Sequence, residues 1–170
     1  MIETSRLQLV RWEEAHFQAI FEKNLIKLGE LLAVETPRAW TTFVDMADAL
    51  DFFYASFKEN GNYWGSFFII HKADRRLLGT CGYKGAPDDI GIIEIGYEVE
   101  ATYRQQGLAT EAAQGLIDFA WQHEEVKDII AHTLAYENPS VCVLKKLGFQ
   151  FVEALNDPDD GDIWRWILMP

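Results

Sequence analysis

The sequence predicts an α+β fold in which a mixed, mostly antiparallel central sheet of about six to seven strands is flanked by helices on both faces. About three or four segments with strand patterns come first along the chain, and we expect them to pair antiparallel. A strand–helix–strand–helix–strand order follows, and a helix between two strands allows them to run parallel. With 170 residues, 49% of them hydrophobic, the chain suits one substantial core, so we expect a single domain over residues 1–170.

The amino-terminal part is expected to contain one strand and two helices. Residues 6–11 alternate polar and apolar side chains, which predicts the strand. Glu13 and Glu14 open a helix expected to continue to about residue 28, because acidic side chains are favoured in a first helical turn. A second helix is expected over residues 42–58, where apolar side chains recur at helical spacing. These side chains are Phe43, Ala47, Leu50, Phe53, Tyr54 and Phe57.

The middle of the chain is predicted to form a hairpin and then a strand that leads into a helix. Residues 66–70 and 77–83 have strand character and are separated by a polar turn. Residues 92–99 alternate apolar and polar side chains, as in a half-buried strand. The turn at Gly107 follows, and a helix with an apolar face should extend to about His123.

The carboxy-terminal part is predicted to be a strand, a short helix and a closing pair of strands. The strand covers residues 129–134. Asn138 is a helix N-cap with Pro139 at the first helical position, and Gly148 ends that helix. The last two strands cover residues 149–154 and 163–168, around a hairpin turn at residues 157–162.

Composition excludes several classes of protein. The formal charge of −12 and the pI near 4.7 argue against binding to nucleic acid or to an anionic membrane, both of which need a basic surface. The excess of acidic residues has two interpretations, which stay open. In one, its electrostatic field suits a cationic or amine substrate, and in the other, the acidic surface merely keeps the protein dispersed in solution. Cys81 and Cys142 lack the spacing of disulfide or zinc sites, and no secretory or membrane-spanning segment is evident, so we expect a cytoplasmic protein.

The run from Tyr103 to Ala112 joins the strand at 92–99 to the following helix through a turn with little side-chain bulk. The first turn of a helix leaves N–H donors unpaired and carries partial positive charge, and Gly107 lets a ligand approach the backbone. The sequence therefore predicts a phosphate-bearing ligand at this turn. A dinucleotide fingerprint is degenerate here, and no Gly-Lys-Ser or Gly-Lys-Thr of a nucleotide P-loop exists in the chain.

Four motifs in order resemble one enzyme family. Arg104-x-x-Gly107-x-Ala109 matches the acyl-CoA pyrophosphate loop of the GNAT N-acetyltransferase superfamily, between its fourth strand and the following helix. The opening segment 4–9, the segment 94–97 and the segment 137–149 are similar to the RimJ/RimL-like branch of ribosomal-protein N-terminal acetyltransferases. The resemblance covers nearly the whole chain.

The resemblance implies acetyl-CoA as the acyl-donor cosubstrate and no metal. Backbone N–H groups of the turn would hold the pyrophosphate, and Arg104 would support the loop or add charge. Main-chain groups of the strand would pair with the pantetheine arm like an added strand. Asn138 would contact the pantetheine by its side chain, although its role as an N-cap already accounts for it. The implied cofactor-binding residues are Tyr97, Glu98, Val99, Arg104, Gln105, Gln106, Gly107, Leu108, Ala109, Thr110 and Asn138.

The same resemblance implies two catalytic residues. Glu94 matches a position where some members of the family keep a general base, with an exposed strand carboxylate as the alternative interpretation. Many members protonate the departing thiolate with a tyrosine at the position of Leu144, where this chain departs from the pattern. Ser140 matches the serine that the RimL-like branch uses instead, and an ordinary first-turn serine is the alternative. The base of that branch lies in the loop after the Gly-Phe pair, where this chain offers Asp157, Asp159 and Asp160 without a clear match.

The function expected from the sequence is acetyl transfer from acetyl-CoA to a primary amine, by direct attack in a ternary complex. A protein N-terminus is the preferred acceptor class, by branch resemblance alone. The alternatives are a small-amine acceptor, such as a polyamine or an aminoglycoside, and a non-catalytic acyl-CoA-binding regulatory protein, which the absence of the tyrosine would favour. The four histidines lack metal spacing, and a homodimer could use the face shared by Trp164, Trp166 and Leu168.

Overall fold

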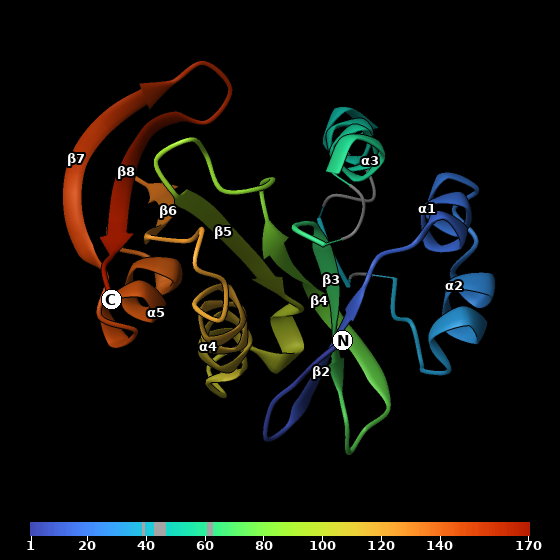
Figure 1. Cartoon of the computed structure of the whole chain (residues 1–170). Coiled ribbons are helices and arrows are strands. Elements are labelled where there is room, and N and C mark those ends of the chain that lie inside the picture. Colours follow the sequence, from blue (N-terminus) through green and yellow to red (C-terminus); the bar gives the residue numbers. More distant parts are fainter. Residues whose placement is uncertain (39, 43–46, 61–62) are drawn as a thin grey trace.

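The computed structural model describes residues 1–38, 40–42, 47–60 and 63–170 (Figure 1). Within these residues the chain forms an eight-stranded sheet in the order β1-β2-β3-β4-β5-β6-β8-β7. The strands are β1 (Ile2–Glu3), β2 (Leu7–Arg11), β3 (Ser66–His71), β4 (Arg76–Tyr83), β5 (Ile92–Val99), β6 (Asp128–Leu134), β7 (Gln150–Asp157) and β8 (Gly161–Leu168). The helices are α1 (Glu14–Phe21), α2 (Leu25–Leu32), α3 (Ala47–Asn60), α4 (Leu108–Ala120) and α5 (Pro139–Lys146), with a 3-10 turn at Ala101–Tyr103.

The sheet is mixed, as predicted. Strands β1 to β5 pair antiparallel in sequence order, and β6, β8 and β7 form a second antiparallel group. The groups are joined by the parallel pair β5–β6, which α4 connects. All seven strands expected from the sequence are present, and the two-residue β1 is an addition that short-range periodicity could not indicate.

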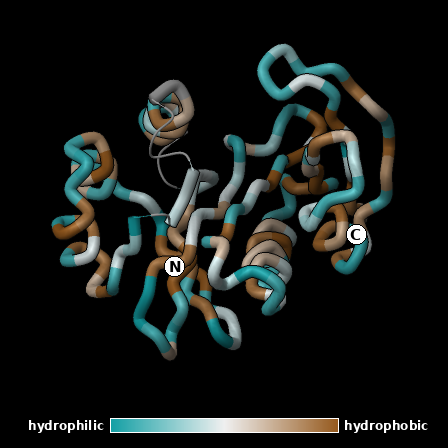
Figure 2. Tube along the Cα trace, turned by 180° about the vertical axis from the view of Figure 1, so that it is seen from behind, coloured by the Kyte–Doolittle hydropathy of each residue, from teal (hydrophilic) through white to brown (hydrophobic). Residues whose placement is uncertain are grey.

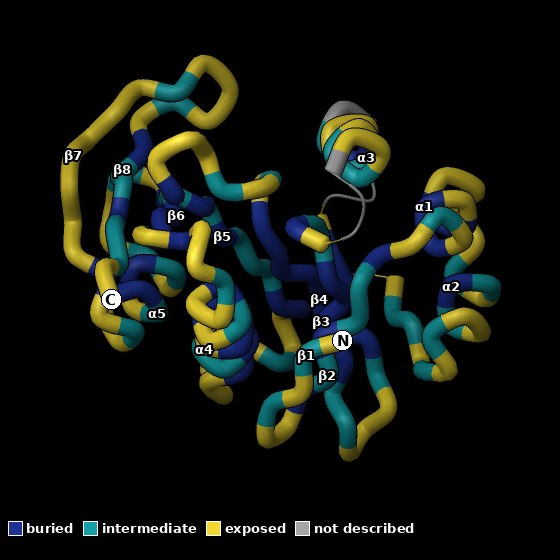
Figure 3. The backbone as a smooth tube through the Cα atoms, viewed as in Figure 1, coloured by how far each residue is buried: buried dark blue, intermediate teal, exposed yellow. Residues whose placement is uncertain are grey.

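Helices cover both faces of the sheet because side chains of a strand alternate between its faces. Phe67 and Ile69 of β3 belong to the core under α4, whereas Phe68 and Ile70 belong to the core under α1, α2 and α3. Figure 1 shows α4 on one side of the central strands and α1 and α2 on the other. In Figure 3 the middle strands are the most deeply buried part of the chain. The α+β prediction with helices on both faces is confirmed.

The first predicted helix is two helices, which corrects the expectation of one helix from residue 13 to about residue 28. Lys23 adopts a left-handed backbone conformation with φ of 53°, which ends α1. The side chain of Asn24 then accepts the N–H of Lys27 and caps α2. Asparagine competes for backbone hydrogen bonds, so it favours a cap over a helix interior.

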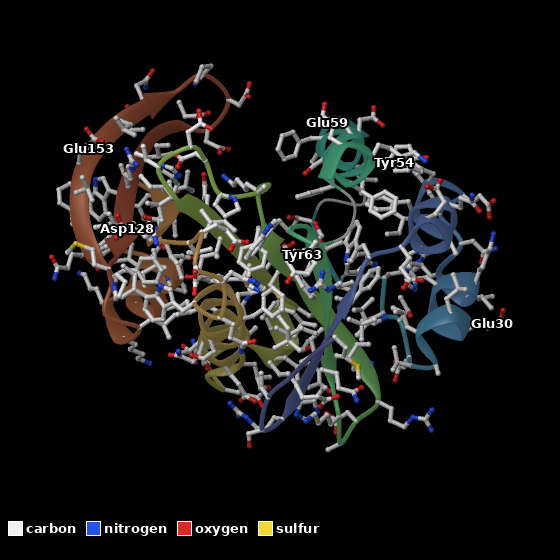
Figure 4. The ribbon with its side chains drawn as sticks, viewed as in Figure 1. Glu30, Tyr54, Glu59, Tyr63, Asp128 and Glu153 are labelled. Carbon is white, nitrogen blue, oxygen red and sulfur yellow. The ribbon has the colours of Figure 1, made fainter. Side chains whose placement is uncertain are left out.

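The second predicted helix is α3, which covers Ala47–Asn60 of the described residues, and Thr42, its expected first residue, lies outside it. Phe43, the first residue of its predicted apolar stripe, lies outside the described residues. Tyr54 of α3 points toward α1 in Figure 4, and its hydroxyl donates to Oε1 of Glu14 at 2.7 Å. Its ring also contacts that of Phe17. These contacts fix α3 against α1 on one face of the sheet.

The last two strands form the predicted hairpin, longer by several residues. Asp157 closes the turn, since its Oδ1 accepts the N–H groups of Asp159 and Asp160 at 2.9 and 3.0 Å. Trp166 is only 3% exposed, and its Nε1 donates to Thr133, so the Trp164–Trp166–Leu168 face packs on the chain's own core. This face is therefore less available to a partner chain than expected, and the homodimer stays a prediction. The exposed strand is instead β7, drawn yellow along its length in Figure 3.

The hydropathy of the residues agrees with this arrangement of the sheet between helices. Figure 2 shows hydrophobic residues along the strands and α4, and hydrophilic residues at the loop tips. Among the helices that the structure describes, none has the length and apolar character needed to cross a membrane. Cys81 is buried, Cys142 is exposed, and both are free thiols.

Candidate active site

A cleft opens where β5 and β6 separate. Their parallel pairing covers only Ile92 with Asp128, Ile93 with Ile129 and Glu94 with Ile130, whereas β5 continues to Val99 and β6 to Leu134. The space between the diverging strands is a cleft of about 510 Å³. It is lined from β5, β6, the start of α5 and the start of α4, with Asp160 of the β7–β8 turn at its rim.

One backbone edge of β5 faces this cleft. The opposite edge is paired with β4, where Cys81 lies opposite Tyr97 and Gly79 opposite Val99. Tyr97, Glu98 and Val99 all line the cleft. A strand edge that has no neighbouring strand presents N–H and C=O groups to an extended ligand. The side chain of Glu98 turns away and accepts hydrogen bonds from the Thr41 hydroxyl and the Thr42 N–H.

The turn before α4 offers a run of unpaired backbone donors at one end of the cleft. In the described part of the chain, the N–H groups of residues 105–110 make no hydrogen bond, and the first helical bond is from Glu111 to Gly107 O. Gln105 and Gly107 both have left-handed backbones, with φ of 61° and 76°. A Cβ built on Gly107 would meet only one atom within 4 Å, an Nη of Arg6 at 3.7 Å. A ligand can therefore approach this backbone closely.

Two arginines flank the turn. Arg104 donates from Nε to the carbonyl oxygen of Val99 at 3.0 Å and lines the cleft, so it ties the turn to β5. Arg6 donates from Nη1 to the carbonyl oxygen of Gln106 at 2.9 Å and from Nε to Glu111 at 2.7 Å. Sequence reasoning did not assign Arg6 to the site, because about a hundred residues separate it from the turn. Its charge beside Gly107 favours an anionic ligand.

Asn138 caps α5, as its sequence context predicts. Its Oδ1 accepts the N–H of Val141 at 3.1 Å, and its Nδ2 donates to the carbonyl oxygens of Tyr136 and Leu134 at 2.8 and 3.3 Å. The residue also lines the cleft. The amide thus has structural partners on both atoms, and its expected ligand contact stays a proposal.

The phenol of Tyr97 reaches the backbone of Ser140 at the start of α5. Ser140 lies in the first turn of α5 and lines the cleft. The phenol of Tyr97 donates to the carbonyl oxygen of Ser140 at 3.3 Å, and burial raises the pKa of Tyr97 well above its ordinary value. Leu144 is fully buried in the core, so this position supplies packing and no proton donor.

The side chain of Glu94 on β5 contacts two other titratable side chains. Its Oε1 lies 2.9 Å from Nδ1 of His132 and 2.5 Å from Nζ of Lys84, and its side chain is 19% exposed. Lys84 and His132 both line the cleft. The structure therefore brings Glu94 together with a histidine that sequence reasoning did not select. The β5–β6 register is the one signal that could have found it, since His132 lies two residues beyond the partner of Glu94 on the same face.

The β7–β8 turn contributes acidic groups to this end of the cleft. The pKa of Asp157 is held below its ordinary value, chiefly by the N–H groups of Asp160 and Asp159 and also by the charges of Lys84 and His132. A carboxylate that its own turn stabilises in the charged form is a weak base. Asp160 lines the cleft, whereas Asp159 does not. In the described residues, no group of three or more His, Cys, Asp or Glu side chains is placed to hold a metal ion.

A smaller cavity of about 100 Å³ adjoins the cleft on the α3 face of the sheet. It is lined by Phe53 of α3, by Gly82 and Gly96 of the facing strands, and by Lys84 and Tyr97, which also line the cleft. No atom lies within 4 Å of a Cβ built on Gly96, so the strand surface is open there. The two spaces meet near the midpoint of β5.

A sheet that splits between two parallel strands, with the unpaired N–H groups of a helix start at one end of the opening, is the arrangement that the sequence resemblance predicts for an acyltransferase that uses a CoA thioester. The family model for the acetyltransferase (GNAT) domain matches residues 6–150. The chain belongs to the GNAT acetyltransferase family, and it is an acetyl-CoA-dependent acetyltransferase by class.

Relatives and solved structures agree with this assignment. An uncharacterized N-acetyltransferase of Bacillus subtilis, YjdG, is 32% identical over 151 residues, covering 88% of this chain and 89% of the relative. A GNAT-family acetyltransferase from Bacillus anthracis superposes with a TM-score of 0.66 at 19% identity, covering 99% and 97% of the two chains. RimL, a ribosomal L7/L12 alpha-N-protein acetyltransferase solved with CoA, superposes with a TM-score of 0.69 at 14% identity, covering 98% and 95%. The expected likeness of fold to the RimL-like branch is confirmed.

Proposed function

We propose that this protein transfers an acetyl group from acetyl-CoA to a primary amine by direct attack in a ternary complex in the cytoplasm, and that the preferred acceptor is a protein N-terminus. The observation that carries this proposal is the run of unpaired N–H groups at residues 105–110, at the end of a cleft between diverging strands. Membership of the family implies acetyl-CoA as the donor. The cleft offers unpaired N–H groups that suit its pyrophosphate and an open strand edge that suits its pantetheine arm.

The donor occupies the cleft from the turn to the middle of β5. The N–H groups of residues 105–110 bind the pyrophosphate, and the charges of Arg6 and Arg104 lie beside it. The pantetheine amides pair with the open edge of Tyr97, Glu98 and Val99 in the manner of an added strand. This arrangement points the thioester toward Ser140 and Lys84, which line the same cleft.

The acceptor enters from the α3 face. The smaller cavity between α3 and β5 reaches Lys84 and Tyr97 and so meets the cleft where the thioester would lie. Asp160 lines the cleft, and the charge of −12 over the whole chain favours a cationic amine. A cavity open at the surface suits a chain end, which has to leave the rest of its protein outside.

Two protons have to be removed from the ammonium form of the acceptor, and one has to reach the thiolate of CoA. Glu94 and Ser140 are the residues expected from the sequence to act on these protons. Ser140 lies at the cleft, where its hydroxyl donates to the sulfur. Leu144 cannot take this role, because its side chain is apolar and buried.

The preference for a protein N-terminus follows the likeness to RimL. RimL, which is described as an alpha-N-protein acetyltransferase, shares the fold at 14% identity, and such a likeness extends to the fold alone. The small volume next to Lys84, about 100 Å³, favours a polyamine, an aminoglycoside or another small amine as the alternative. A non-catalytic acyl-CoA-binding protein is the remaining alternative, which the leucine at position 144 supports.

A thiol-release assay distinguishes these possibilities. Acetyl-CoA is offered with N-terminal peptides, polyamines and aminoglycosides, and mass spectrometry of each acceptor locates the added acetyl group. We expect acceptor-dependent release of CoA, fastest with N-terminal peptides. Tight CoA binding without release in any mixture would support the binding-protein alternative, and release with small amines alone would move the acceptor to that class.

A further inference from the structure

The side chains of Glu94 and His132 form a pair across the β5–β6 seam. Glu94 faces Ile130 in the parallel register, and His132 follows two residues later on the same face of β6. The distance between Glu94 Oε1 and His132 Nδ1 is 2.9 Å, and the two side chains are 19% and 21% exposed. This contact joins the strands at the point where the cleft opens.

A carboxylate that accepts a hydrogen bond from Nδ1 fixes the tautomer of the neutral imidazole. The proton then resides on Nδ1, and Nε2 carries a free lone pair that can accept a proton. The same carboxylate stabilises the imidazolium once Nε2 has been protonated. His132 lines the cleft, so this lone pair is available on the side where the acceptor amine meets the thioester.

Glu94 is in a poorer position to take the proton itself. Its Oε1 contacts both His132 and Lys84, and these two residues are the ones that line the cleft. The oxygen that would take the proton is thus already in contact with an ammonium group and an imidazole nitrogen. Its contribution to the reaction therefore passes through the histidine.

The structure assigns His132 as the general base of the transfer and Glu94 as its positioning residue. This inference rests on the proposed acetyl transfer to an amine. The groups that face His132 are Glu94 on β5, Lys84 after β4, Asp157 and Asp160 in the β7–β8 turn, and Arg165, its register partner on β8.

The step balances as follows. The ammonium form of the acceptor releases one proton to solvent, and the neutral nitrogen attacks the thioester carbonyl as His132 Nε2 removes a further proton. The new C–N bond forms, the C–S bond breaks, and the thiolate takes a proton from the Ser140 hydroxyl. The imidazolium returns its proton to the serine oxygen directly or through water, so the products are the acetylated amine, CoA as the thiol and one proton in solvent.

The main test compares His132→Asn with the wild type over a range of pH at saturating acetyl-CoA. An asparagine amide can still donate to Glu94 but has no basic nitrogen, so kcat should fall about 100-fold or more, with CoA affinity within about twofold. The acidic limb of the wild-type pH–rate profile should disappear, and added imidazole should restore part of the rate. His123→Asn is the control, since His123 lies beyond α4 against Tyr63, and it should keep wild-type kinetics.

The second variant is Glu94→Gln, which keeps an acceptor for the imidazole N–H and removes the charge. Its kcat should fall about tenfold, and its acidic limb should move to lower pH, because a neutral amide no longer stabilises the imidazolium. The acidic limb of the pH–rate profile could survive in His132→Asn while kcat falls further in Glu94→Gln than in His132→Asn. That result would make Glu94 the base and overturn the assignment. Wild-type kcat in His132→Asn would overturn it as well.

A measurement without turnover separates this inference from the proposed function. The ¹⁵N spectrum of the imidazole should show His132 with its proton on Nδ1 in the wild type. A proton on Nε2 would overturn the assignment even in an active enzyme. A wild type that acetylates no amine would instead refute the proposed transfer, and with it the base role, whatever the tautomer.

Discussion

Ser140 and Leu144 lie one helical turn apart in α5, yet only Ser140 reaches the cleft. The two residues share one side of the helix, but the rise of about 6 Å between them carries Leu144 away from the cleft and into the core. A proton donor for the leaving thiolate therefore has to come from the first turn of α5 or from β5. Tyr97 is the alternative on β5, but its phenol is already engaged with the carbonyl oxygen of Ser140.

Replacing Ser140 with alanine should lower kcat about tenfold to 100-fold and leave the affinity for CoA nearly unchanged, because the hydroxyl acts on the departing sulfur. Steady-state kinetics with acetyl-CoA and an accepted amine provide the measurement. Tyr97→Phe should keep kcat within about threefold if the serine is the donor. A larger loss of kcat in Tyr97→Phe than in Ser140→Ala would instead make Tyr97 the proton donor to the thiolate.

At the residue scale, the positions of Arg6 and His132 beside the candidate site could not be predicted from the sequence. The loop at residues 104–110 was predictable because its donors, its glycine and its helix are adjacent in the chain. Arg6 reaches the loop only through the pairing of β2 within the sheet and its contacts with Glu111, and His132 meets Glu94 only through the strand register. Neither contact has a signature within a short window of sequence.

At the scale of elements, the start of α4 combines a strained turn with an anchored first helical turn. Gln105 and Gly107 provide the left-handed positions that turn the N–H groups outward. Glu111, one turn into the helix, accepts hydrogen bonds from the Thr4 hydroxyl at 2.7 Å and from the Arg6 N–H at 2.6 Å. The amino-terminal segment therefore holds the first turn of α4, next to the unpaired N–H groups of residues 105–110.

Gly107→Val should weaken CoA binding about tenfold or more. A β-branched residue at φ of 76° is strained, so the turn should change its conformation and lose donors to the pyrophosphate. Because only Arg6 lies within 4 Å of the new Cβ, we expect the fold to persist with a loss of about 1–2 kcal/mol. Isothermal titration with CoA and urea denaturation measure the two effects.

Gly148→Val is the matched control for that variant. Gly148 has φ of 88°, and a Cβ there would lie 3.6 Å from Leu168, at the end of α5. It should show a similar loss of stability with unchanged CoA affinity. If Gly107→Val and Gly148→Val bound CoA with equal affinity, the turn at Gly107 would not be part of the donor site.

The stability that Glu111 provides should depend on pH. Burial opposes its ionisation, but the hydrogen bonds from Thr4 and Arg6 prevail and hold the pKa of Glu111 below its ordinary value of 4.5. A lowered pKa in the folded state stabilises the protein above pH 4.5, and this contribution is lost as the pH falls through the lowered pKa. Glu111→Gln should cost about 2 kcal/mol at neutral pH.

Urea denaturation at a series of pH values checks this expectation. The gap between wild type and Glu111→Gln should narrow as the pH falls below 4.5. Glu30→Gln is the control, since Glu30 is exposed on α2 (Figure 4) and should change stability little at any pH. A gap that is constant across the series would contradict the assigned hydrogen bonds.

The elements themselves show where sequence reasoning succeeds and where it fails. Period-2 alternation and turn residues located the seven longer strands, and Asn138 and Pro139 located the start of α5. The break between α1 and α2 was missed because the apolar spacing continues across Asn24, whose side chain caps the second helix. The β1 strand was missed because two residues have no period.

At the scale of the whole molecule, the charge of −12 acts on every approaching acceptor. Cations are drawn toward an acidic surface, and the attraction weakens as salt shortens the Debye length. The donor is itself anionic, and we expect it to bind beside Arg104, which lines the cleft, and near Arg6, which is paired with Glu111. Opposite ends of the cleft are thus suited to opposite charges.

An acceptor with additional positive charge should consequently have a lower KM than a neutral analogue at low salt. Raising NaCl from about 50 mM to about 500 mM should raise the KM of the cationic acceptor and leave that of the neutral one nearly unchanged. Initial rates at saturating acetyl-CoA measure both values. Identical salt responses would show that the acidic surface has no part in acceptor selection and serves only to keep molecules apart.

The short seam between β5 and β6 couples ligand binding to folding. Three register pairs join the two halves of the sheet, and the backbone edge beyond them has no strand beside it. A donor bound along that edge adds cohesion that exists only in the folded chain, so by mass action CoA at about 100 times its Kd should stabilise the protein by about 2.7 kcal/mol. For a chain of this length, that corresponds to a rise in Tm of roughly 5–10 °C, so thermal melting with and without CoA measures whether CoA binds the folded chain.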